Sequence, residues 1–291
     1  MVITLDLIIQ SLFDGIFMGF LYSLVALGLS LVFGVMGIIN FAHGDFVMIA
    51  AYLTWVVANF FRAEPLETSL ITIPLFFIVG ALLYYILIRP LLGKEPLIQI
   101  AVTVGLGYVL QNIALIYFRA EPRSSPSTIF NSYIRLGIIN VHIAKLLAAV
   151  LSLSVIILLH YMLTRTWFGL AIKATAYNKE AAILMGINVD KVYMVVFGIG
   201  IALTALASSI WMTYGQVNPY LGNSFNLVSW VIIALAGLGG VKGVVASSII
   251  VGVVSALTMN TISPSIQSAV AYIVFLVVLW FKPRGLFGGG E

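Results

Sequence analysis

The sequence contains no cysteine and few charged residues. Without cysteine, the chain forms no disulfide, carries no thiol nucleophile and offers zinc no cysteine ligand. Charged residues make up 8% of the 291 residues, whereas a soluble globular domain has roughly 25%. So few charges cannot cover a surface that faces water, and lipid must cover most of this one. The composition therefore predicts a polytopic membrane protein surrounded by membrane lipid.

Motifs for catalysis and nucleotide binding are also missing. The stretch GLGGVKG (Gly237–Gly243) lacks the G-x-x-x-x-G-K-[ST] spacing that cradles ATP phosphates. No H-E-x-x-H occurs, and the three histidines lie far apart in sequence. The formal net charge of +4 comes from basic residues scattered between apolar runs, which does not indicate a nucleic-acid partner. We expect no catalytic residue, no metal and no cofactor bound by this chain.

Long apolar runs account for most of the chain, which is 62% hydrophobic. A helix needs about 20 apolar residues to cross the hydrocarbon core, and continuous runs favour helices over a β-barrel. The sequence predicts an all-α, polytopic transmembrane helical bundle of about eight or nine spans, in one transmembrane domain over residues 1–291. The predicted spans are Leu7–Phe33, Phe46–Phe60, Leu70–Ile88, Leu97–Phe118, Leu146–Leu163, Val192–Met212, Phe225–Val241, Val244–Asn260 and Ala269–Phe281.

The basic residues predict which connections face the cytoplasm. If alternate connections lie on the same side, nine of the 14 basic residues fall in one set and five in the other, and the richer set is expected to be cytoplasmic. No basic residue precedes Arg62, so we expect a retained first span rather than a cleaved signal peptide. The richer set is Arg89, Lys94, Arg165, Lys173, Lys179, Lys191, Lys242, Lys282 and Arg284.

The second predicted span is too short to cross the membrane alone. Its 15 residues reach about 22 Å as a helix at 1.5 Å per residue, against roughly 30 Å of hydrocarbon. We therefore expect the preceding residues 34–45 to enter the membrane as a broken or re-entrant segment, with Gly37 and Gly44 as hinge or packing glycines. A second glycine-rich break holds Gly237, Gly239 and Gly240. Paired breaks in the two halves of a chain indicate a transport path.

Polar residues in and near these spans are the candidates for lining a path. The segment INFAHGDF contains Asn40, His43 and Asp45, and the fourth span contains Gln111 and Asn112. One interpretation is a polar break beside the conduit. The other is structural: Asn40 or Asp45 caps the next helix, and the Gln111–Asn112 pair bonds between helices. Because Asp and His also build proton relays, a proton-coupled carrier remains an alternative.

The connection of residues 164–191 is predicted to contain a short amphipathic helix. Asn178 is placed to cap it, and Glu180 falls in its first turn, where the helix dipole favours a negative charge. Ala181, Leu184 and Met185 share one face, and Gly186 supplies a stop. Such a helix either lies on the membrane surface or docks into a groove of a partner protein.

Four stretches occur in order: GLSLVFGVMGIINFAHGDFVMIAAY from Gly28, ATAYNKEAAILMGINVDKV from Ala174, ALAGLGGVKGVVASSIIVG from Ala234 and KPRGLFG from Lys282. Together they resemble the permeases of branched-chain amino acid ABC transporters, of the high-affinity leucine/isoleucine/valine type. The resemblance covers nearly the whole chain. It implies an inner-membrane, multi-pass subunit that is not an enzyme, with ATP and Mg²⁺ used by other subunits.

The same resemblance implies partners and a coupling element. The expected partners are a second related permease (a heterodimer or a homodimer), two cytoplasmic ATPase subunits and an extracytoplasmic substrate-binding protein. The coupling element that docks on the ATPase would hold Glu180, Ala181, Ala182 and Gly186. The substrate would be a branched-chain or related amino acid. Permeases for urea and short amides share these features, so that substrate class remains an alternative.

Overall fold

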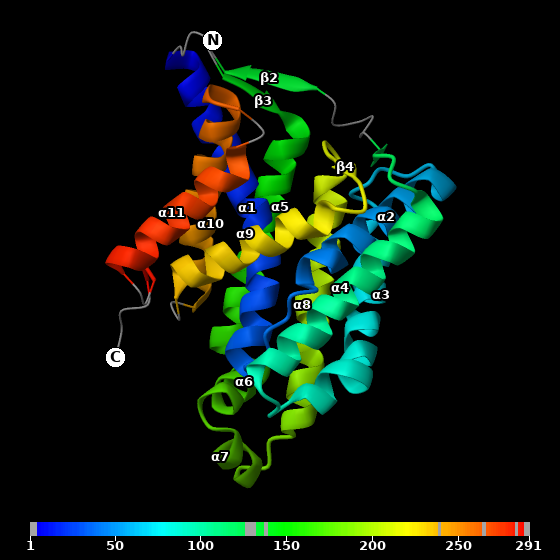
Figure 1. Cartoon of the computed structure of the whole chain (residues 1–291), viewed down its shortest axis with the longest axis vertical. Coiled ribbons are helices and arrows are strands. Elements are labelled where there is room, and N and C mark those ends of the chain that lie inside the picture. The colour runs from blue at the N-terminus through cyan, green and yellow to red at the C-terminus, as the bar shows by residue number, and fades with distance from the viewer. Residues whose placement is uncertain are drawn as a thin grey trace.

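The structure is a computed structural model that describes residues 5–125, 132–136, 139–237, 240–263, 266–282 and 285–287. Among these residues, seven helices are long and apolar enough to cross a membrane, and two shorter apolar helices accompany them. The predicted helical membrane bundle is confirmed, and each of the nine helices overlaps one predicted span. The seventh predicted span, Phe225–Val241, was placed too late: its helix is Leu221–Ala236, and Val241 belongs to the next helix. Figure 1 shows most of the helices running along one long axis, with α9 lying across it.

The helices follow each other with few long connections. Their bounds are α1 (Leu5–Met36), α2 (His43–Phe61), α3 (Ser69–Leu83, continued by π turn Tyr84–Ile88 and 3-10 turn Arg89–Leu91), α4 (Pro96–Phe118), α5 (Ile143–Arg165), α6 (Trp167–Tyr177), α7 (Lys179–Leu184), α8 (Val189–Trp211), α9 (Leu221–Ala236), α10 (Gly240–Thr261) and α11 (Gln267–Phe281).

Two small antiparallel sheets lie at the end of the molecule that holds the start of α1 (Figure 1). Strand β2 (Tyr133–Leu136) pairs with β3 (Ile139–His142), and β1 (Arg123–Ser124) pairs with β4 (Gln216–Val217). The sequence indicated only a polar connection between the fourth and fifth spans. Within that connection, alternating β-branched and polar residues such as those of β3 fit a pleated strand, so the chain folds back as a hairpin.

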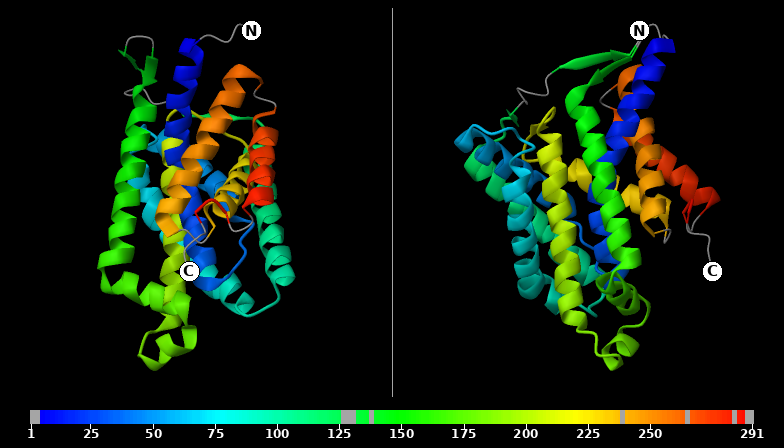
Figure 2. Two further views of the ribbon diagram at one scale, coloured as in Figure 1. Left: turned by 90° about the vertical axis from the view of Figure 1, so that its left-hand side faces the viewer. Right: turned by 180° about the vertical axis from the view of Figure 1, so that it is seen from behind.

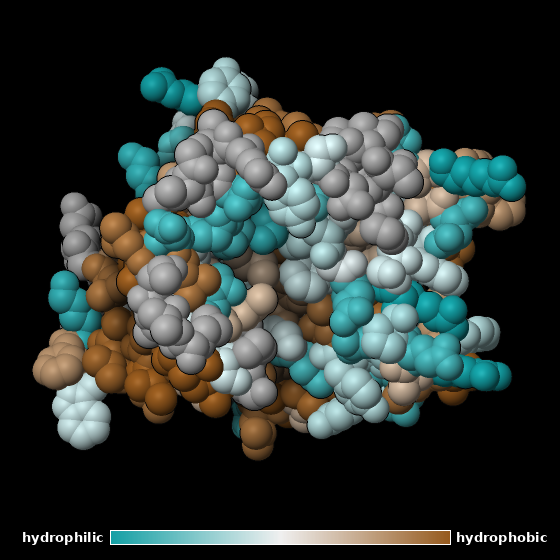
Figure 3. Space-filling model, turned by 90° about the horizontal axis from the view of Figure 1, so that it is seen from above, coloured by the Kyte–Doolittle hydropathy of each residue, from teal (hydrophilic) through white to brown (hydrophobic). Residues whose placement is uncertain are grey.

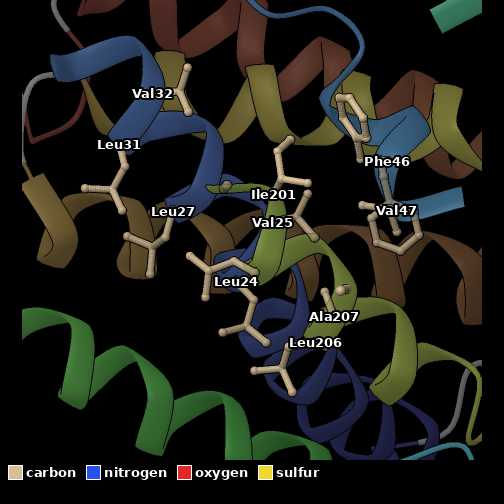
Figure 4. Packing of buried hydrophobic residues seen from close by; sticks show 14 of the residues in the cluster. Leu24, Val25, Leu27, Leu31, Val32, Phe46, Val47, Ile201, Leu206 and Ala207 are labelled. Atoms are coloured by element: carbon tan, nitrogen blue, oxygen red, sulfur yellow. The ribbon is translucent and has the colours of Figure 1, made fainter. Parts of the chain in front are cut away.

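The core lies where α1, α2 and α8 meet. Leu24, Val25 and Val32 of α1 are fully buried against residues such as Ile201 and Ala207 of α8 (Figure 4). All three helices are apolar around most of their circumference, as expected for helices packed inside a bundle. By contrast, α3 and α4 have less than a third of their apolar windows buried. These two helices form the part of the bundle that is most open to lipid or to a partner.

Helices α1 and α10 lie side by side in the two views of Figure 2 and approach closely through glycines. A Cβ at Gly15 would lie 2.5 Å from the Cα of Val253, and one at Gly19 would lie 2.7 Å from the Cα of Ile249. No side chain fits between the two backbones at these positions. Small residues allow such close approach between membrane helices, which here joins the first and tenth helices.

The predicted break between the first two spans is present and buried. Helix α1 ends at Met36, and Gly37 adopts the left-handed conformation (φ 65°) that ends many helices. Residues 37–42 are not helical, and α2 starts at His43, three residues before the predicted start. Ile38, Asn40 and Ala42 are fully buried. Irregular backbone is tolerated at membrane depth where protein surrounds it, and this segment meets that condition.

Candidate functional site

The broken segment is held by a polar face of α4. The side-chain oxygen of Gln99 accepts the Ile39 N–H (3.2 Å). The Thr103 hydroxyl accepts the Phe41 N–H (3.1 Å) and lies within donating distance of the Ile39 carbonyl (3.2 Å). Both α4 residues are buried. In place of intrahelical bonds, α4 therefore satisfies the backbone groups that the break leaves open.

Asp45 of α2 packs against the same face of α4, in a narrow space (the slot) that exists because Gly107 and Gly222 have no side chains. Its carboxylate accepts a hydrogen bond from Gln111 Nε2 (3.0 Å) and lies 3.4 Å from Asn226 Nδ2. A Cβ at Gly107 would be 2.5 Å from Asp45 Oδ2, and one at Gly222 would also clash with the carboxylate. Asp45 is 2% exposed. A carboxylate in this setting joins α2 to α4 and α9 through two amide donors.

Asn226 of α9 closes the other side of the segment. Its side-chain oxygen accepts the Gly44 N–H (2.8 Å), and its amide nitrogen donates to the Phe41 carbonyl. The backbone of Gly44 packs so closely against Gly222 and Asn226 that a Cβ would overlap them. Gly44 is thus a packing glycine at the α2–α9 contact, whereas Gly37 has open space around it and ends α1.

His43 and Asn40 point away from the carboxylate. His43 Nε2 lies 3.1 Å from the carbonyl of Val25 in α1. A carbonyl only accepts, so Nε2 carries the proton and Nδ1 a lone pair. Asn40 Oδ1 accepts the Ala42 N–H. Asn40 Nδ2 and His43 Nδ1 have no hydrogen-bond partner among the described residues, so each has capacity left for water or for another conformation. No hydrogen bond joins His43 to Asp45 in this part of the chain.

Of the predicted path residues, the structure brings four together and leaves one apart. Asn40, His43, Asp45 and Gln111 surround the break, but Asn112 is exposed on a different face of α4 and donates to the Tyr108 carbonyl (2.7 Å). A hundred degrees of helical rotation separates neighbours, so the Gln111–Asn112 pair cannot share a site.

Sequence reasoning missed four of the residues that shape the site: Gln99, Thr103, Gly107 and Asn223. The first three precede Gln111 at intervals of four residues, which places all of them on one face of α4. Asn223 Oδ1 accepts a hydrogen bond from Gln111 (2.7 Å). The four-residue spacing of the α4 residues was the signal in the sequence that could have identified them as one face. Asn226 of α9 also bonds between helices, through the Gly44 N–H and the Asp45 carboxylate.

The predicted cytoplasmic helix is present as α7, although the connection holds two helices rather than one. Asn178 ends α6 and caps α7, with its side chain accepting the Ala181 N–H (2.9 Å). Glu180 lies in the first turn, and Gly186 follows in the left-handed conformation (φ 81°). Ala182 is buried, whereas Leu184 and Met185 are 88% and 82% exposed. Helices α6 and α7 form the end of the molecule opposite the strands (Figure 1).

The second glycine break is only partly described. Gly237 ends α9 with φ 58°, and Gly240 starts α10 with φ 63°. Gly239, also predicted as a hinge or packing glycine, lies outside the described residues. Leu286, near the end of the chain, donates its N–H to the Leu235 carbonyl (2.7 Å), so the tail packs at this break.

Chemically, the site is an anchor for irregular backbone rather than a reaction centre. In the part of the chain that the structure describes, no group of three or more acidic or histidine side chains could hold a metal ion. The polar groups instead bind the first break to α4 and α9. The break also lies where the chain passes from one span to the next, between α1 and α2.

Comparison with known proteins agrees with this geometry. Residues 11–279 match a family model described as "Branched-chain amino acid transport system / permease component". The high-affinity branched-chain amino acid permease protein LivH of Escherichia coli K12 is 28% identical, with 97% of this chain and 96% of LivH covered. BraD of Pseudomonas aeruginosa, with the same description, is 27% identical at the same coverage.

One solved structure shares the fold. PsaBC from Streptococcus pneumoniae, in complex with a Fab, matches 94% of this chain and 93% of its own with a TM-score of 0.50 and 13% sequence identity. At that identity the similarity concerns the fold alone, and it supports the helical arrangement of the bundle. The family match is the stronger result, since it spans nearly all nine apolar helices.

The family match confirms several expectations from the sequence. The chain is a multi-pass inner-membrane permease of an ABC importer, it is not the catalytic subunit, and the ATP-hydrolysing activity with its cofactors resides in a separate protein. The chain belongs to the family of permease components of branched-chain amino acid transport systems.

Proposed function

We propose that this chain imports branched-chain or closely related amino acids across the cytoplasmic membrane. In this proposal it pairs with a second, related permease, as a heterodimer or a homodimer, and binds two ATPase subunits. An extracytoplasmic binding protein delivers the substrate. The substrate assignment is supported by full-length relatives described as branched-chain amino acid permeases. Residues 1–291 would act as one transmembrane domain with its coupling loop at 164–191.

The exposed tip of the α6–α7 connection is the observation that carries the proposal. Leu184 and Met185 are almost fully exposed beyond the ends of α5 and α8, while Ala182 fixes α7 to the bundle. An exposed apolar surface of this kind is typical of an interaction site. Basic and acidic residues flank it at Lys179, Glu180 and Lys191, as in the rim of a protein–protein interface.

Coupling requires a rigid link from this tip to the spans. Helix α7 is capped at its start by Asn178, and Gly186 N–H closes its end on the Ile183 carbonyl (2.9 Å). Tyr84 donates to Asp190 (2.6 Å), and Arg89 forms an ion pair with the same carboxylate (3.1 Å). These bonds tie the start of α8 to the end of α3, so a displacement of α7 is passed to two membrane helices.

The test is co-purification of the chain with candidate ATPase subunits, followed by ATP-driven uptake. We expect Gly186→Asp, Glu180→Lys and Leu184→Ser each to reduce co-purified ATPase at least about tenfold, the size of a modest interface contact. The matched control is Ile262→Ser, which removes an exposed aliphatic side chain after α10. Normal ATPase binding and transport in the three variants would refute the coupling role.

The substrate is tested separately by uptake of radiolabelled leucine, isoleucine, valine, urea and acetamide with the matching binding protein. Uptake of leucine-type substrates in competition with one another supports the assignment. Uptake of urea or acetamide with no leucine uptake would assign the chain to the urea and amide systems. A requirement for ATP, unaffected by an uncoupler at constant ATP, would separate both from a proton-coupled carrier based on His43 and Asp45.

A further inference from the structure

A large cavity opens among the helices at the end of the molecule that carries the strands, opposite α7. Its volume is about 1210 Å³, which exceeds the roughly 300–1,000 Å³ of most small-molecule sites. The walls come from α1, α5, α9, α10 and the segment after α8. Figure 3 looks onto this end, where hydrophilic side chains gather toward the middle of the face. A space of this size holds a small solute together with water.

An ion pair lies in the wall of the cavity: Asp14 belongs to the first predicted span, and Lys145 lies in the first turn of α5, directly before the fifth predicted span. Lys145 Nζ lies 2.6 Å from Asp14 Oδ1, and both residues line the space. Gln10 donates to the second oxygen of Asp14 (3.1 Å) and also bonds the backbone of Asn140. The side chains of Asp14 and Lys145 remain 21% and 32% exposed. Charges inside spans are costly and usually functional, and these two keep access to the cavity.

Aromatic rings form another part of the cavity wall. Phe225 packs edge-on against Tyr22 (5.9 Å between ring centres) and Trp211 (5.7 Å), and Trp211 packs against Tyr214 (5.6 Å). All four line the cavity. Such a wall accepts apolar side chains, and its ring faces attract an ammonium group. Burial, with smaller contributions from Tyr22 and Asp14, raises the pKa of Tyr214, so this hydroxyl stays protonated.

We propose that the cavity is a receiving site for a free, zwitterionic amino acid with an apolar side chain. The α-ammonium group binds Asp14, the α-carboxylate binds Lys145, and the side chain lies against Phe225 and Trp211. This assignment rests on the proposed function and adds a defined site to it. The chain then takes up the solute from its extracytoplasmic carrier before any movement of the bundle.

The pairing of charges argues for a zwitterion over other solutes. A cation at Asp14 would leave Lys145 without its counter-ion, and an anion at Lys145 would do the same to Asp14. A zwitterion replaces one ion pair by two, so neither buried charge loses a partner. An uncharged solute such as urea gains nothing from this exchange. The large volume and the competing internal ion pair both predict weak binding, suited to a site that must release its solute.

The experiment measures ligand binding to the full-length chain, purified in lipid nanodiscs with the subunits that accompany it but without binding protein or ATP. Saturation-transfer NMR titrations use leucine, isoamylamine, 4-methylpentanoate and urea. We expect leucine to bind at least about tenfold more tightly than either singly charged analogue, the effect of one charged hydrogen bond. Asp14→Asn and Lys145→Gln should each weaken leucine binding by at least the same factor, whereas Lys94→Gln, at an exposed position before α4 and outside the cavity, should not.

A second pair of variants covers the case in which the charge variants fail to fold. Ser224 is exposed and lines the cavity, so Ser224→Trp should fill the space and abolish leucine binding. The matched control, Ser154→Trp, lies on an exposed face of α5 outside the cavity and should leave binding intact. Equal binding of leucine and urea, or leucine binding that survives Ser224→Trp, overturns the receiving site. ATP-driven leucine uptake in that case would leave the proposed function standing, so the two failures are distinguishable.

Discussion

At the scale of single residues, the slot around Asp45 is the most constrained point of the structure. Two helices contribute glycines where any side chain would meet the carboxylate, and two amides supply donors to it. The position of the carboxylate therefore depends on the missing side chains of the two glycines as much as on the two amide donors. Its buried position in the first turn of α2 also places it at the positive end of the helix dipole.

Gly107→Ala should destabilise the protein by about 1–3 kcal/mol, in the range for overpacking a well-filled interior. The new Cβ would lie 2.5 Å from Asp45 Oδ2 and displace a buried carboxylate. Gly105→Ala is the matched control two residues earlier on α4, because nothing lies within 4 Å of its Cβ position. Thermal unfolding in nanodiscs compares the two. Equal unfolding temperatures would show that the slot is not tight.

His142 predicts a pH dependence of stability at the end of the molecule that carries the strands. Its Nδ1 accepts the Ala144 N–H and caps α5 (3.3 Å), which only the neutral ring can do. Burial, then the nearby Lys145, lowers the pKa of His142 from 6.5, with Asp14 opposing. The unfolded chain therefore takes up the proton first. The stabilisation is complete above about pH 6.5 and is lost as the pH falls through the lowered pKa of the folded state.

His142→Asn should flatten this dependence, because asparagine caps helices at any pH. Between pH 7.5 and 5.5, the wild type should lose about 1 kcal/mol more stability than the variant, the value of one cap. The measurement is the unfolding temperature in nanodiscs as a function of pH. His160→Asn serves as the control for general effects of histidine loss. Parallel pH curves for wild type and His142→Asn would contradict the capping role.

At the scale of elements, the broken segment depends on α4 for its backbone hydrogen bonds. Thr103→Val keeps the shape of the side chain but removes the acceptor of the Phe41 N–H. Leaving a buried donor unsatisfied costs about 1–3 kcal/mol, so the variant should unfold at a lower temperature and transport more slowly. Thr103→Ser retains the hydroxyl and should behave as wild type. A valine variant with wild-type stability would mean that water or another group replaces the threonine.

The same elements show what the sequence could and could not predict. The approximate spans could be predicted from hydropathy. The break could be predicted because the apolar run that starts at Phe46 is shorter than the membrane is thick. The partners of the break were less predictable. Gln111 was named and Gln99 was not, since which polar residues meet depends on how α4 packs against residues 37–45. Asn112 was placed with Gln111 because sequence neighbours were taken as one site, although a helix turns them apart.

The connection of residues 164–191 was also predicted only in part. Asn178, Glu180 and Gly186 were read correctly as cap, first-turn acid and stop, because capping depends on local chemistry. The separate helix α6 was not foreseen. It starts at Trp167 after Thr166, whose side chain accepts the Gly169 N–H (3.1 Å). A Ser or Thr before an apolar run is a start signal that was present in the sequence.

At the scale of the whole molecule, the chain should be unable to move solute uphill by itself. Reconstituted alone in liposomes, it is expected to accumulate no leucine, because no nucleotide-binding motif is present and ATP hydrolysis belongs to a separate subunit. Adding the ATPase subunits, the second permease and the binding protein should give uptake that requires internal ATP. Radiolabelled leucine provides the readout. Accumulation by the isolated chain would refute the importer assignment.

The glycine contact between α1 and α10 limits how the bundle can move. Where two backbones touch at Gly15 and Gly19, the helices cannot part or slide without opening a void that no nearby side chain fills. The two helices therefore behave as one rigid unit along the long axis of the protein. In any rearrangement of the bundle, α1 and α10 must move as a unit, and α5 and α9 must approach or leave them. Because the chain has no native cysteine, introduced cysteine pairs can be cross-linked either between α1 and α10 or between this pair and α5 or α9. Transport that survives only the first kind of cross-link would show that the α1–α10 contact stays fixed while the other contacts change.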